Sequence, residues 1–110
     1  MKIPNQLKIG AFIWDIKIDD NVAHEGSVYG STHSKSQTIF LDPNTTKQHL
    51  EEILLHEALH SIVWQTGLYE RLKSASGISE EEIVSTISPA LYQLLIENKL
   101  DFGEDNEKKS

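Results

Sequence analysis

The sequence predicts a small α+β domain in which a short antiparallel sheet packs against two main helices. Up to residue 42, apolar residues show partial period-two alternation and are rich in the β-branched and aromatic types that favour strands. From residue 44 onward they recur every three or four positions, as in amphipathic helices. A chain of 110 residues suits one domain, which we place at residues 1–102, followed by a polar, acidic tail at 103–110 that should fray.

Three segments favour strands. LKIGAFIWDIKI at residues 7–18 fits one or two strands with a bend at Gly10. A short strand is expected around residues 28–29. QTIFLD at 37–42 gives the clearest strand, because it is rich in strand-forming residues and stops at an Asp-Pro pair.

Two longer segments favour helices. The first helix should span residues 44–67, with Thr45 and Gln48 forming a capping box and Gly67 ending the helix. LYERLKSASG then forms a connection with room for a helical turn.

The second main helix should begin at Ser79, capped over SEEE, and run to about Asn98. Pro89 falls inside it and predicts a kink or a local break. Its expected inner face consists of Val84, Ile87, Leu91, Leu94 and Leu95.

The composition excludes several classes of protein. The net charge is −7, with 17 acidic against 10 basic residues, which argues against binding to nucleic acid or to an anionic membrane surface. Because the chain has no cysteine, disulfides and thiolate zinc sites are excluded, and a metal would have to use His, Asp or Glu. No apolar run approaches the roughly 20 residues of a membrane span, and the N-terminal residues lack a signal-peptide core. We therefore expect a cytoplasmic protein.

The first helix contains His56-Glu57-Ala58-Leu59-His60, an HExxH pattern. Histidines four residues apart lie on the same face of a helix and can bind one zinc ion. Glu57 lies one step round the helix, where it can act as general base toward a water that zinc activates. The alternative is a pair of partly buried histidines bonded to neighbours, with Glu57 as a solvated charge.

A catalytic zinc site needs a third protein ligand and an open position. The extended pattern HExxHxxGxxH is excluded, because Val63 stands at the position of its Gly and Thr66 at the position of its third His. The second main helix opens with Glu80, Glu81 and Glu82. On a helical wheel the first two flank the apolar face and the third points away, so the spacing leaves Glu80 and Glu81 open. The remaining glutamates would be charges favoured by the helix dipole.

The order of these motifs resembles the ImmA/IrrE-type zinc metallopeptidases and their small phage- and prophage-encoded relatives. The resemblance covers about residues 28–97: a strand ending IFLDPN, a helix carrying LLHEALH, and a helix opening EEIVSTISPAL. In the family, a downstream Glu is followed by apolar residues three and six positions later. In this chain that Glu is Glu81, followed by Val84 and Ile87. The family usually has Gly before the second histidine, whereas this chain has Leu59.

The resemblance implies a minimal zincin-like domain with the HExxH helix at its centre. It implies Zn²⁺ bound by His56, His60 and Glu81, with Glu57 as catalytic base, and a protein or peptide as substrate. The better-known members cleave or regulate repressors that carry helix-turn-helix domains. In zincin-like folds the edge strand near the site pairs with an extended substrate. Residues 37–41 could serve that purpose or be an ordinary structural edge strand.

The other histidines are less informative. His49 is too far along the helix, about 10.5 Å from His56, to share its ion. His24 and His33 are in polar loops, where they could stabilise an oxyanion, close over the site or simply be exposed. Tyr92 and Trp64 are expected to pack in the interior.

Two other functions remain open. One is a structural zinc domain without turnover, in which His24 or His33 closes the site as a fourth ligand. The other is a non-enzymatic interaction module with a degenerate site. The sequence does not predict the oligomeric state.

Overall fold

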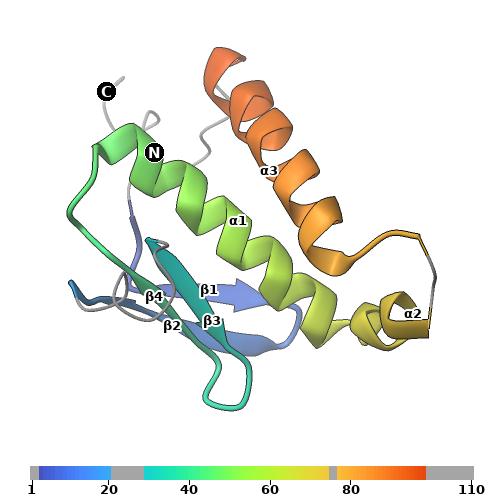
Figure 1. The fold of residues 1–110 in the computed structure, drawn as a ribbon. Coiled ribbons are helices and arrows are strands. Elements are labelled where there is room, and N and C mark those ends of the chain that lie inside the picture. Colours follow the sequence, from blue (N-terminus) through green and yellow to red (C-terminus); the bar gives the residue numbers. More distant parts are fainter. Residues whose placement is uncertain (1–2, 21–28, 75–76, 99–110) are drawn as a thin grey trace.

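A computed structural model describes residues 3–20, 29–74 and 77–98 (Figure 1). Within these described ranges, four strands come first, followed by three helices. The expected α+β class is therefore confirmed, whereas the predicted tail at 103–110 lies outside the described residues. The elements are β1 (Gln6–Ile9), β2 (Phe12–Ile18), β3 (Gly30–His33), β4 (Thr38–Leu41), α1 (Lys47–Gln65), α2 (Leu68–Ser74) and α3 (Glu80–Glu97).

The sheet is mixed rather than antiparallel, with the strand order β1-β2-β4-β3. β1 and β2 form a hairpin that turns at Gly10, whose φ of 62° suits glycine. β3 and β4 also pair antiparallel, but β4 inserts between β3 and β2 and runs parallel to β2. Parallel neighbours need a crossover connection, and the chain between β2 and β4, which includes β3, provides it. The prediction of an antiparallel sheet is therefore wrong for the central pair.

The strand that we expected at the sheet edge lies in its interior. β4 has a neighbour on each side, and its Ile39 and Leu41 are fully buried. The two edges of the sheet are β1 and β3 instead. The strand expected at residues 28–29 is thus displaced along the chain: Tyr29 directly precedes β3, and Val28 lies outside the described residues.

One face of the sheet packs against α1 (Figure 1). The buried core between them consists of Trp14, Ile16, Ile39, Leu41 and Leu54, with Trp64 and other half-buried side chains around it. α1 is capped by Thr46, whose side chain accepts a hydrogen bond from the His49 amide, and not by Thr45 as predicted. Gly67 follows the last turn with a φ of 79°, which confirms it as the residue that ends the helix.

α3 packs mainly on α1, on the side away from the sheet (Figure 1). It begins at the predicted capping box, in which the Ser79 and Glu82 side chains each accept a hydrogen bond from the other residue's amide. It runs through Pro89 as one helix, so the local break that we considered is absent.

The inner face of α3 is more polar than predicted. The buried residues are Val84, Ser88 and Tyr92, whereas Ile87 and Leu94 are 48% and 50% exposed. The Tyr92 hydroxyl donates to the buried Glu51 carboxylate of α1 at 2.7 Å, so the predicted packing residue also makes a polar link between the helices. None of the described helices is long and apolar enough to cross a membrane.

Candidate metal centre

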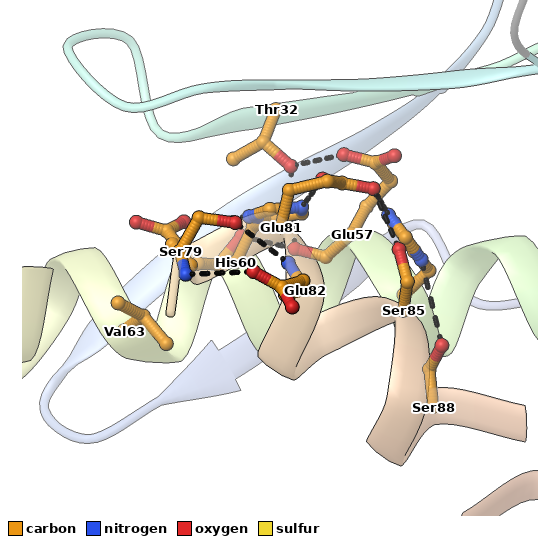
Figure 2. Close-up of polar contacts among 12 residues, drawn as sticks. Thr32, Glu57, His60, Val63, Ser79, Glu81, Glu82, Ser85 and Ser88 are labelled. Carbon is orange, nitrogen blue, oxygen red and sulfur yellow. Dashed lines mark hydrogen bonds and ion pairs between the residues drawn. The ribbon is translucent and has the colours of Figure 1, made fainter. Parts of the chain in front are cut away.

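The HExxH residues lie in the middle of α1, where this helix passes between the sheet and the first turns of α3 (Figure 1). The helical spacing places His56 and His60 one turn apart with ring centroids 5.0 Å from each other. The Ser79 cap starts α3 opposite these rings and brings Glu81 to them (Figure 2). The candidate site is therefore assembled from two helices that are about 20 residues apart in sequence.

Both histidines present the same nitrogen to the same carboxylate. His60 Nε2 lies 2.8 Å from Glu81 Oε1, and His56 Nε2 lies 3.4 Å from Glu81 Oε2. One potential ligand atom from each of the three residues lies within 4.8 Å of the other two, and no other such group occurs among the described residues. The structure thus brings together the three residues that we predicted as ligands.

This arrangement fits the donor set of a zinc site. Two ligand atoms about 2.0–2.1 Å from a tetrahedral zinc ion lie about 3.4 Å apart, which matches the separation of His56 Nε2 and Glu81 Oε2. The shorter distance from His60 to Glu81 is that of a hydrogen bond, so this pair would have to separate slightly around an ion. Two imidazoles and one carboxylate also form the set that leaves a fourth position open in catalytic zinc sites.

Glu80 has a role that sequence reasoning missed. Its Oε2 lies 2.6 Å from His60 Nδ1, on the far side of the ring from Glu81. A carboxylate in this position fixes the orientation of a metal-binding imidazole and leaves Nε2 for the metal. We expected the two glutamates that were not ligands to be only charges near a helix start, and that expectation is wrong for Glu80. Adjacent residues of a first turn can both reach one ring, which no spacing rule reveals.

His56 has a weaker hydrogen-bond partner, which also lies on α3. The hydroxyl of the buried Ser88 lies 3.4 Å from His56 Nδ1 (Figure 2). Ser88 lies two turns along α3 from Glu81, so one helix contacts both nitrogens of His56. Each imidazole therefore has Nε2 toward Glu81 and Nδ1 toward an oxygen that can accept a hydrogen bond from it.

Glu57 points away from α3 and toward the edge of the sheet. Its side chain is only 8% exposed, and Thr32 of β3 donates a hydrogen bond to its Oε1 at 2.5 Å (Figure 2). Gly30 lies beside it, and a Cβ atom there would come within 3.1 Å of Glu57 Cγ and 2.6 Å of Ile53 Cγ2. The predicted base is thus held by a strand that contacts α1 too closely for a side chain at residue 30.

Neighbouring side chains shift the pKa values of two of the predicted ligands. Burial alone would lower the pKa of His60, but its hydrogen bond to Glu80 and the charges of Glu57 and Glu81 raise it overall. Partial burial would raise the pKa of Glu81, but the hydrogen bond that Ser85 donates and the two nearby histidines lower it. The carboxylates around His60 therefore favour its protonated form when no metal is bound.

Two cavities lie on either side of the site, and both are lined by Glu57 and His60. The first has a volume of about 610 Å³ and extends toward the start of α1. The second has a volume of about 370 Å³ and extends toward the end of α1. β3 passes along both cavities, because Gly30 lines the first and Thr32 lines the second.

The remaining histidines stand apart from the ligand group. His49 is exposed and lines the first cavity beside Tyr29, with ring centroids 5.5 Å apart. His33 is exposed at the end of β3, packs against Phe40 and lines neither cavity. His24 lies outside the described residues, so the roles considered for it stay untested.

Comparisons of the chain with protein-family models, with curated proteins and with solved structures found no match. What the site can do chemically therefore rests on its own residues and distances.

Proposed function

We propose that this protein is a zinc-dependent peptidase of a minimal zincin-like type. One observation supports this most directly: two α1 histidines and an α3 glutamate converge, with the carboxylate of Glu57 beside them between two cavities. A site built only to hold a metal has no need of a buried carboxylate facing open cavities. Relationship to the ImmA/IrrE-type peptidases is part of the proposal and is supported by the HExxH helix and the downstream Glu81.

His56, His60 and Glu81 would hold the ion. An ion held by these residues would supply Lewis-acid chemistry, which brings the pKa of a water to about 7 and polarises a peptide carbonyl. Glu57 would take a proton from the attacking water and deliver it to the amine of the leaving peptide. Thr32 would fix the position of the Glu57 carboxylate through its hydrogen bond, and Glu80 would keep His60 in the tautomer that binds metal.

The substrate backbone would lie along β3. This strand forms the edge of the sheet and passes along both cavities, so its outer side can accept an extended peptide by β-augmentation. Side chains on either side of the scissile bond would then enter the two cavities. β3 therefore takes the role that we considered for residues 37–41, which are enclosed in the sheet.

Glu57→Gln tests the proposal, because it keeps the side-chain volume and removes the base. We expect zinc-supplied wild-type protein to contain about one zinc per chain and to cleave members of a fluorogenic peptide library. Glu57→Gln should keep the zinc and lose at least about 100-fold in rate. Glu97→Gln, at the exposed end of α3, is the matched control and should retain both properties.

Three results would contradict parts of the proposal. Absence of zinc after the metal is supplied would exclude the metal site. Zinc without cleavage of any library member would favour a structural site instead. Equal turnover by the Glu57→Gln and wild-type proteins would exclude Glu57 as the base.

A further inference from the structure

The second cavity differs from the first in its aromatic walls. Its rim includes the aromatic side chains of Trp64 and Tyr69, whose rings are stacked with an interplanar angle of 15°. It also includes Glu80 and Ser34. The described residues that line it include no lysine or arginine. A cavity with aromatic walls and a carboxylate favours a cation over a neutral or acidic group.

Glu80 can contact a ligand without leaving its partner. Its Oε2 accepts from His60 Nδ1, whereas no described residue makes a hydrogen bond to Oε1. Its side chain is 32% exposed, so the second oxygen can be reached from the cavity. A guanidinium or ammonium group could therefore pair with Glu80 while Glu80 continues to orient His60.

The position of this cavity links it to the proposed reaction. Glu57 and His60 form its inner wall, so a side chain that fills it belongs to a residue next to the bond at the zinc site. Thr32 of β3 lies on its wall, which is where a peptide paired with β3 would place a side chain. The cavity, at about 370 Å³, has room for one long side chain.

We propose that the second cavity selects substrates with an arginine or lysine side chain beside the scissile bond. The cation would lie between the Trp64–Tyr69 pair and Glu80. This inference rests on the proposed peptidase function for its meaning, but the binding preference can be measured without turnover.

Binding is tested with zinc-loaded Glu57→Gln protein and two peptides, acetyl-Ala-Ala-Ala-Arg-Ala-Ala-amide and the same peptide with citrulline in place of arginine. Citrulline keeps the shape of arginine and loses its charge. The chain has two tryptophans, and Trp14 is fully buried, so a change in tryptophan fluorescence on binding reports on Trp64. We expect the arginine peptide to bind at least about fivefold more tightly, because a partly exposed ion pair and a cation–π contact each contribute modestly.

Ser34→Lys and Ser36→Lys form a matched pair of variants. Both serines lie in the turn between β3 and β4, but only Ser34 lines the cavity. We expect Ser34→Lys to abolish the preference for arginine over citrulline and Ser36→Lys to retain it. If the Glu57→Gln protein does not fold, the comparison of the two peptides is repeated with the metal-free wild-type protein.

The proposal is overturned if the two peptides bind equally, if neither binds, or if both lysine variants reduce the preference alike. An arginine preference in a protein that cleaves nothing would support the cavity assignment and exclude the peptidase. Cleavage that ignores arginine and lysine would support the peptidase and exclude the cavity assignment.

Discussion

At the residue scale, the three glutamates that open α3 have three different contacts. Glu80 orients His60, Glu81 faces both histidines, and Glu82 closes the capping box. The wheel had correctly placed Glu82 away from the site but could not separate the other two. Only the rotation of α3 about its own axis decides between them, and that rotation is set by its packing on α1.

The different contacts of Glu81 and Glu82 predict that their substitutions have unequal effects on zinc binding. We expect Glu81→Ala to weaken zinc binding by about 100-fold or more, because it removes one of the three proposed ligands. Glu82→Ala removes an equal charge from the same turn and should change zinc affinity far less. Competition with a chromogenic chelator measures both values. Equal losses would show that Glu81 acts only through its charge.

The close contact at Gly30 predicts a stability effect. Gly30→Ala would place a methyl group 2.6 Å from Ile53 Cγ2 and 3.1 Å from Glu57 Cγ, so the strand or α1 must move. Overpacking of this kind costs about 1–3 kcal/mol in the free energy of unfolding. Urea denaturation measures it, with Ser31→Ala on the same strand as control. A loss of less than about 0.5 kcal/mol would mean that β3 moves away easily.

At the element scale, the sequence predicted what depends on neighbours along the chain and missed what depends on distant partners. The positions of α1, α3 and β4 and the signals at Ser79 and Gly67 were predicted correctly, because periodicity and capping are local. The parallel pairing of β2 with β4 was not predicted, because strand order depends on which hydrophobic faces meet.

The same distinction applies to the site. His56 and His60 follow from helical spacing, whereas the hydrogen bond from Thr32 to Glu57 joins residues 25 positions apart. The sequence shows a polar residue at position 32 but nothing that pairs it with α1. The partly wrong inner face of α3 has a related cause. This helix has one main neighbour, so part of its apolar surface stays exposed.

The capping box of α3 predicts an effect of Ser79 on the metal site. Ser79→Ala removes the side chain that accepts from the Glu82 amide, which should cost about 1 kcal/mol in the free energy of unfolding. The first turn holds Glu80 and Glu81, so its loosening should also lower zinc affinity. Thermal unfolding and chelator competition measure the two effects. Thr46→Ala, which removes the cap of α1 away from the site, should lower the stability in the same way without lowering the zinc affinity.

At the scale of the whole molecule, a proton and the proposed metal ion would compete for one place between α1 and α3. The raised pKa of His60 means that in the metal-free protein this ring keeps a proton above pH 6.5. Its pairing with the carboxylates then stabilises the metal-free fold at low pH, and that contribution is lost as the pH rises through the raised pKa. Zinc needs the unprotonated ring.

We therefore expect apparent zinc affinity to fall as the pH is lowered through the pKa of His60, with the decline beginning above 6.5. Glu81 has a lowered pKa and stays ionised throughout this range, so it should not contribute to the decline. Zinc titrations against a chelator between about pH 5.5 and 8.5 measure the dependence. A constant affinity down to about pH 6 would show that the pairing of His60 does not persist in solution.

Because α3 is held mainly by α1, the candidate site could be split between two fragments of the chain. The two histidines belong to a helix that the sheet holds in place, whereas Glu81 belongs to a helix whose main support is α1. A polypeptide that ends after α2 would therefore keep two imidazoles and lack the carboxylate. A separate peptide spanning α3 could restore it in trans, and zinc would then act as a reporter of reassembly between the two fragments.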